Sequence, residues 1–330
     1  MKKILILLMV ITSIYLIGCT KNNKDVIKKM KDKIDNMASY HIKGELGIVN
    51  NEDIYKYDVD VSYKANDLFR VSLKNINNNH TQILLKNEEG VYVLTPALNK
   101  SFKFQSDWPY NNSQIYLLQS ILKDIENDSN AKVIEDGKSY IITSKVNYSN
   151  NDSLVKQKVY LDSDYNIKKV EVLDNDDVVL MNMSFNSINE RPNFSDDYFD
   201  LDSSINTSIN DNALEVSKIE SIIYPMYIPD KTYLLDQDKI STPEGERVIL
   251  TFDGDNPFMF IEETSTILKD HTIIPINGNP EIIGDAIGVV SNNSVSWSSG
   301  GIDYYVTSNS LSEKELLTVA NSINVMPVGK

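Results

Sequence analysis

The feature that most constrains the fold is a change of hydrophobic period at Tyr40. From there apolar and polar residues alternate in successive short runs, which is the pattern of strands with one buried and one exposed face. In residues 55–63 the odd positions are mostly tyrosines and valines, whereas Lys56, Asp58 and Asp60 occupy even positions. Asn-rich or Glu-Gly turns separate the runs. The pattern predicts an antiparallel meander with one apolar face.

Eleven such runs precede residue 190. Six lie between residues 40 and 105, and five follow at 132–136, 139–147, 153–162, 165–174 and 178–187. Arg70 and Lys74 join the charged residues on the polar face. An apolar face of this size needs a cover of other elements.

Two helices are predicted to provide that cover. Val26, Ile27, Met30, Ile34 and Met37 recur at helical spacing, and packing on the core is favoured over lying on a membrane because aspartates are interleaved with the lysines. A second helix is expected over residues 113–126, with Asn112 or Ser113 as its N-cap. Its apolar stripe is formed by Ile115, Leu118, Ile121, Leu122 and Ile125.

The N-terminus has the pattern of a lipoprotein signal. Lys2 and Lys3 precede an apolar run, Ile4–Gly18, that is shorter than the roughly 20 residues of a membrane-spanning helix. The run ends in Leu-Ile-Gly-Cys, so residues 1–18 are expected to be removed and Cys19, the only cysteine, to carry a diacylglyceryl group. Two acyl chains would anchor the chain to the outer face of the cell membrane through a tether, residues 19–25. The alternative is an ordinary cleaved signal.

A polar stretch at 202–214 is predicted to be a linker between a first domain, 26–201, and a small α+β domain, 215–330. Strands of the second domain are expected at 222–228, 246–252, 258–262, 281–290, 294–298 and 302–307. A closing helix at 312–323 would begin at Ser310 or Ser312, followed by acidic residues that complement the helix dipole.

The charge and the motifs limit the function classes. A formal net charge of −15 would repel a phosphate-rich partner, so no nucleic acid is expected. No cofactor, metal or catalytic residue is predicted, because His41, His80 and His271 are far apart in sequence. Residues 162–166 begin like a calcium loop, but Ile167 stands where glycine is needed, so we expect a hairpin turn. Residues 253–257 are likewise expected to form a turn.

One segment carries a resemblance to a known family. Residues 91–109, VYVLTPALNKSFKFQSDWP, running on to QIYLL at 114–118, closely resemble the sporulation lipoproteins of the YdcC type, which belong with LolA/LolB-like lipoprotein carriers and receptors. This resemblance covers residues 26–201 and implies an incomplete antiparallel β-barrel of about eleven strands, covered by helices. Residues 224–229, 250–252, Trp297 and the closing helix resemble a small C-terminal module that often follows such sheets in bacterial lipoproteins.

The resemblance also implies a role for Arg70. In the family an arginine at the entry to the third strand hydrogen-bonds across to the lid, and Asp67-Leu68-Phe69-Arg70 stands in that place, although the preceding turn lacks the family's proline. The alternative is a solvated strand arginine.

Two hypotheses for function follow. The first is a non-enzymatic, membrane-anchored protein of the spore envelope that binds a partner protein, such as a cortex peptidoglycan-processing enzyme, through its curved sheet. The second is a carrier or receptor that binds a lipid or the acyl chain of a lipoprotein in the cup between sheet and helices. An open pocket lined by Tyr57, Val59, Val71, Ile115 and Leu118 would favour the second hypothesis, and a cup filled by side chains would favour the first. An enzyme is the third class.

Overall fold

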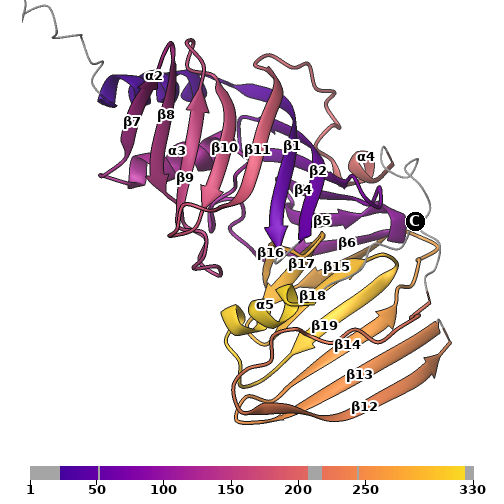
Figure 1. Cartoon of the computed structure of the whole chain (residues 1–330). Coiled ribbons are helices and arrows are strands. Elements are labelled where there is room, and N and C mark those ends of the chain that lie inside the picture. The colour runs from indigo at the N-terminus through magenta and orange to yellow at the C-terminus, as the bar shows by residue number, and fades with distance from the viewer. Residues whose placement is uncertain (1–22, 51–52, 207–217, 244, 324–330) are drawn as a thin grey trace, which may run out of the picture.

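The computed structural model describes residues 23–50, 53–206, 218–243 and 245–323. The chain is mostly β, with one sheet of 12 strands and one of 7. Figure 1 shows the two sheets at opposite ends of an elongated molecule, with β12 and α2 far apart.

The first sheet contains the predicted meander. Its strand order is β15-β6-β5-β4-β3-β2-β1-β11-β10-β9-β8-β7, and all neighbours from β6 to β7 pair antiparallel. The eleven strands expected before residue 190 are therefore present. Their bounds are β1 (Ser39–Asn50), β2 (Asp53–Lys64), β3 (Leu68–Asn75), β4 (Thr81–Asn87), β5 (Gly90–Thr95), β6 (Lys100–Phe104), β7 (Lys132–Asp136), β8 (Ser139–Lys145), β9 (Lys156–Leu161), β10 (Ile167–Leu173) and β11 (Val179–Asn189). A short 3₁₀ turn, η1 (Pro96–Leu98), joins β5 to β6.

The twelfth strand comes from far along the chain and was not predicted. β15 (Thr272–Ile276) pairs parallel with β6, aligning Ile274 with Phe102. Pro275 is tolerated because β15 is an edge strand, where one row of backbone groups needs no sheet partner.

Two helices pack on the apolar face of the first sheet. α2 (Asn23–Asp35) buries Val26, Met30 and Ile34 in the same core as the strands, as predicted. α3 (Leu118–Asn127) buries the predicted stripe from Leu118 onward. Its start was predicted wrongly at 112–113. Leu117 is extended at the N-cap, because residues 112–117 are held in irregular structure by contacts described below.

The opposite face of β4 and β5 carries a smaller apolar core. Ile83, Leu85 and Tyr92 are buried there beneath Phe199 and α4 (Leu201–Asn206). α4 occupies the first residues of the predicted linker 202–214. Residues 207–217 lie outside the described residues, so the boundary between the domains remains a prediction.

The second sheet has the order β12-β13-β14-β19-β18-β17-β16. Its strands are β12 (Thr232–Thr242), β13 (Gly245–Gly254), β14 (Phe258–Thr264), β16 (Asn279–Ile283), β17 (Ala286–Ser291), β18 (Ser294–Ser299) and β19 (Ile302–Thr307). The closing helix α5 (Glu313–Asn321) packs on this sheet through Leu316 and Val319. Ser312 caps it in a reciprocal capping box with Glu315, which confirms the predicted start.

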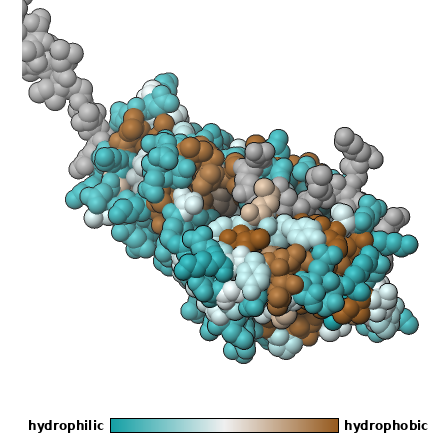
Figure 2. All heavy atoms as spheres, turned by 60° about the horizontal axis from the view of Figure 1, so that its bottom comes forward, coloured by the Kyte–Doolittle hydropathy of each residue, from teal (hydrophilic) through white to brown (hydrophobic). Residues whose placement is uncertain are grey.

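Two predictions for this sheet were wrong, and one strand was not predicted. Residues 222–228 form irregular structure and no strand, because Pro225 interrupts the segment, Pro229 follows it, and proline lacks the backbone donor that a ladder needs. The run 281–290 is two strands separated by a turn at Gly284, which has a φ of 56°. β12 was missed, and most of its residues are exposed. Figure 2 brings this end of the molecule forward and shows hydrophobic residues on its surface among hydrophilic ones.

Candidate functional site

Under the carrier or receptor hypothesis, five residues would line an open cup between the first sheet and its helices. Tyr57, Val59, Val71, Ile115 and Leu118 are all buried and belong to one apolar cluster between the first sheet and its helices. Of these five, only Ile115 borders the cavity described below. The space between sheet and helices is thus occupied by side chains at these positions.

Arg70 points to the other side of the sheet. Its neighbours Phe69 and Val71 are buried in the cluster that includes α3, and successive strand residues face opposite ways. The Arg70 guanidinium lies 5.5 Å from the centre of the Tyr198 ring, a cation–π contact. The guanidinium therefore lies on the side of the sheet away from α3, whereas the resemblance implied a hydrogen bond across to the lid.

Cys19 lies outside the described residues, so its lipidation remains a prediction. Within the described part of the chain, no helix combines the length and the apolar character needed to cross a membrane.

The structure places a cavity where the two sheets meet. Its volume is about 190 Å³. The wall is contributed by the ends of β1 and β11, the segments 112–116 and 148–154, β16 and α5. Apolar side chains that line it include Ile48, Leu84, Trp108, Ile115, Tyr116, Leu154, Met181, Ile282 and Leu317, and polar ones include Asn50, Asn112, Gln114, Tyr148, Asn150, Glu281 and Asn321.

Glu281 is the one carboxylic acid among the described residues that line this cavity. It sits on β16, and its Oε1 accepts hydrogen bonds from the Nδ2 atoms of Asn112 (2.9 Å) and Asn150 (3.4 Å). Burial disfavours the charged form and raises the pKa of Glu281 to about 7, although the two amide donors act in the opposite direction. The carboxyl therefore changes charge near neutral pH.

Neighbouring polar groups hold the segment 112–117 in its irregular shape. Ser113 Oγ donates to Asp124 Oδ2 at 2.7 Å and accepts from the backbone N–H of Asn147, also at 2.7 Å. Burial raises the pKa of Asp124 to about 6, against the effect of the Ser113 hydrogen bond. Tyr116 Oη donates to Gln114 Oε1 at 2.6 Å. The Ser113 hydroxyl is thus engaged by Asp124 and Asn147 and does not cap a helix that starts at 113.

The hairpin of β16 and β17 docks the second sheet on the first. Gln82 of β4 bonds both backbone groups of Ile287, with Nε2 donating to O at 2.9 Å and Oε1 accepting from N at 2.6 Å. Asn78 Nδ2 donates to Asp285 Oδ2 at 3.0 Å. Burial raises the pKa of Asp285, whereas hydrogen bonds from Ser299 and Asn78 oppose the shift. Ile287 and Val289 pack into the core of the first sheet.

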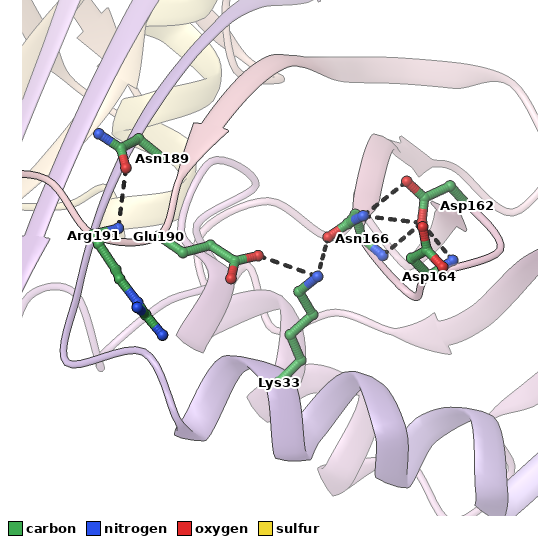
Figure 3. A network of polar contacts seen from close by, with 7 residues as sticks. All are labelled: Lys33, Asp162, Asp164, Asn166, Asn189, Glu190 and Arg191. Carbon is green, nitrogen blue, oxygen red and sulfur yellow. Dashed lines mark hydrogen bonds and ion pairs between the residues drawn. The ribbon is translucent and has the colours of Figure 1, made fainter.

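The turn at residues 162–166 is the hairpin turn that was predicted in place of a calcium loop. Asp162 Oδ1 accepts from the backbone N–H of Asp164 at 2.9 Å, and Oδ2 accepts from Asn166 Nδ2 at 2.9 Å (Figure 3). Burial opposes the charged form, but these donors outweigh it and lower the pKa of Asp162. Lys33 of α2 bonds Asn166 and pairs with Glu190 at 3.1 Å, so this network joins the first helix to β9, β10 and the end of β11.

His41, His80 and His271 have different surroundings. Among the residues that the structure describes, no three His, Cys, Asp or Glu side chains gather into a possible metal site. His41 Nε2 lies 2.9 Å from Asp60 Oδ1, and His271 Nε2 lies 2.8 Å from Ser101 Oγ. His80 is buried, which lowers its pKa to about 4. Residues 255–257 connect β13 to β14, in agreement with the predicted turn.

The sequence comparison decides the family. No family model matches the chain. The sporulation protein YdcC of Bacillus subtilis (strain 168) is 35% identical over 306 residues, which cover 92% of this chain and 90% of that protein. The chain belongs to the YdcC family of sporulation proteins. The YdcC-type resemblance of segment 91–118 is thereby confirmed.

Solved structures give weaker likenesses. The MucA/MucB complex of Pseudomonas aeruginosa has 10% identity and a TM-score of 0.34, covering 90% of this chain and 98% of that one. A LolA superfamily protein of Nitrosomonas europaea has 11% identity and a TM-score of 0.31, covering 55% and 98%. The GerS lipoprotein structure with the CwlD amidase from Clostridioides difficile has 19% identity and a TM-score of 0.20, covering 54% and 98%. At these TM-scores, no property of the three proteins is assigned to this YdcC-family chain.

Sequence reasoning missed Glu281 and its amide partners. One signal was present, because Glu281 is the first residue of the apolar run 281–290 that was predicted to be a strand. A carboxylate within an apolar strand must be paired or change its pKa. Asn112 was considered only as a helix N-cap, and Asn150 gave no signal, since asparagine is common in the predicted loops of this chain.

Proposed function

We propose that this YdcC-family chain is a non-enzymatic lipoprotein of sporulation, anchored on the outer face of the cell membrane through Cys19, that binds a partner protein of the spore envelope. The observation that carries the proposal is the filled cup. Tyr57, Val59, Val71 and Leu118 occupy the place where the rival hypothesis needs space for an acyl chain.

The filled cup also changes where the partner is expected to bind. A curved sheet whose apolar face is covered by α2 and α3 does not offer that face to a partner. The partner is therefore expected to bind elsewhere on the molecule.

A binding role is favoured over a catalytic one by the state of the buried carboxyls. Asp124, Glu281 and Asp285 each accept hydrogen bonds from side chains that fix the fold. Glu262 accepts from the backbone N–H of Ile223 at 2.8 Å. Each thus has a structural partner that accounts for its presence.

Capture from sporulating cells tests the proposal. The full-length chain is cross-linked in the spore-forming host, and its partners are identified by mass spectrometry beside a Cys19→Ala control. We expect an envelope protein that is enriched with the anchored chain and reduced with the control. Recovery of no envelope protein, together with normal spores in a deletion strain, would contradict the proposed function.

Native mass spectrometry tests the rival hypothesis. A lipid that copurifies in stoichiometric amount with the detergent-solubilised chain would favour the carrier or receptor. The structure predicts no such lipid in the cup, because the side chains there are already in contact with one another.

A further inference from the structure

β12 is an exposed edge strand of 11 residues. It forms the end of the second sheet, and within the described part of the chain β13 is its one strand partner. Nine consecutive residues, 233–241, are exposed. A strand at the end of a sheet presents one row of backbone N–H and C=O groups that can pair with a further strand. β12 is thus a template for an added strand.

The side chains along this edge are apolar to an extent that needs an explanation. Tyr233, Leu234, Leu235 and Ile240 are 54%, 40%, 58% and 46% exposed. The segment 224–228 adds the exposed side chains of Tyr224, Met226, Tyr227 and Ile228, and Tyr224 Oη donates to Gln237 Oε1. Figure 2 shows hydrophobic residues gathered at this end of the molecule. Large exposed apolar patches on folded proteins mark interaction sites.

The charges on β12 restrict what can bind. Lys239 pairs across the ladder with Glu246 at 3.0 Å. Asp236 and Asp238 have no cationic partner among the described residues. They share one face of the strand, because their positions differ by two. That face is turned away from the core, since the buried Leu250 of β13 lies opposite Gln237.

The same carboxylates disfavour a second copy of this chain as the occupant. In an antiparallel pair of identical strands, residues of the same parity stand opposite one another. The centred registers then place Asp236 opposite Asp236, Asp236 opposite Asp238, or Asp238 opposite Asp238. Like charges directly opposite one another are destabilising. Two chains of net charge −15 add general repulsion.

We propose that β12 binds an extended segment of a partner protein in which basic and apolar residues alternate, so that the segment adds as the next strand of the sheet. Basic side chains would lie beside Asp236 and Asp238, and apolar side chains on the other face would lie beside Leu234, which stands opposite the buried Phe252. Main-chain hydrogen bonds would supply affinity and the charges would supply selectivity. This inference rests on the proposed function, because it names the surface by which the partner is held.

A defined peptide tests the strand. The probe is a nine-residue peptide of alternating lysine and valine, blocked at both ends, with a glutamate–valine peptide as its control. Hydrogen exchange is measured on the full-length chain in detergent micelles. We expect the lysine peptide to protect amides within 232–242 and the glutamate peptide to protect none of them.

Charge reversal provides the matched variants. The double variant Asp236→Lys and Asp238→Lys should bind the lysine peptide about tenfold more weakly, because two favourable cross-strand pairs become repulsive. The control is Glu135→Lys with Asp136→Lys on β7, the edge strand of the other sheet, where both residues are exposed. It changes the net charge equally and should leave binding within twofold.

Several results would overturn the inference. The first is protection of amides only outside residues 232–242. The second is equal affinity for the lysine and glutamate peptides. The third is an equal loss of lysine-peptide binding in the β7 control variant. A dimer that dissociates on charge reversal, or vesicles that bind through β12, would assign the surface to another occupant. If the captured envelope partner is recovered equally with the Asp236 and Asp238 variant, β12 is not the binding surface, although the partner-binding function stands. Absence of any partner contradicts the function itself.

Discussion

Replacing Glu281 by glutamine should make the protein more stable at neutral and alkaline pH. Both amide donors, from Asn112 and Asn150, reach Oε1, so Oε2 is free to carry the proton of the neutral acid. Glutamine has nearly the same shape as the neutral acid. Its Oε1 can accept the same two bonds, and its N–H can occupy the place of the O–H.

The magnitude follows from the pKa. Burial raises the pKa of Glu281 from 4.5 to about 7. Between these values the native state retains a proton that the unfolded chain releases, so the free energy of unfolding falls as pH rises through this window. Above pH 7 the whole penalty is present, and it amounts to about 3 kcal/mol. Glutamine has no charged form, so the variant Glu281→Gln avoids this loss.

Urea unfolding followed by circular dichroism at pH 4.5, 6 and 8 measures the effect. The gain of Glu281→Gln over the unaltered chain should be near zero at pH 4.5 and should reach about 3 kcal/mol at pH 8. Glu262 also has a pKa raised to about 7 by burial, but its contribution is common to both proteins and cancels. Exposed Glu135→Gln serves as the control. A gain that does not change with pH, or a loss at pH 8, would refute the reasoning.

Three further outcomes are expected. Leu118→Ala removes a buried side chain of α3 and should lower the free energy of unfolding in urea by about 2–5 kcal/mol. The exposed control Leu235→Ala should change it by about 0.5 kcal/mol or less. Equal effects of the two variants would mean that α3 is not packed on the sheet. Cys19→Ala should lose the lipid mass increment and leave the membrane fraction, and unchanged mass with tight membrane association would refute the lipobox. Gln82→Ala leaves both backbone groups of buried Ile287 without partners and should cost about 2–4 kcal/mol, with faster hydrogen exchange at that amide; unchanged exchange would contradict the docking contact.

The parts of the fold that could be predicted are those whose cause is local. The alternation in 55–63 reports burial of one face of β2, and the stripe of Val26, Met30 and Ile34 reports burial of one side of α2. β12 escaped because most of its residues are exposed on both faces, so its sequence shows no period of two. β15 was not predicted because its partner strand β6 is remote in the chain, and no local pattern encodes that pairing.

The candidate site was harder to predict for a related reason. Its wall combines segments near residues 50, 114, 150 and 281, and the polarity of each suits an ordinary loop or strand end. Leu118 was placed correctly because helical spacing fixes its face. Ile115 is buried as expected, but it lies in irregular structure. The Ser113 hydroxyl bonds Asp124 and Asn147 and does not begin the helix there.

The parallel pairing of β15 with β6 sets an order of events during folding. The meander can form in sequence from local hairpins, but the outer edge of β6 must wait for a segment that lies roughly 170 residues further along, about 10–30 s of synthesis at ordinary translation rates. During that interval Phe102 and its neighbours belong to an open edge that can pair with another chain. Completion of the first sheet therefore depends on the arrival of the second half, and a chain released early would be expected to aggregate through this edge.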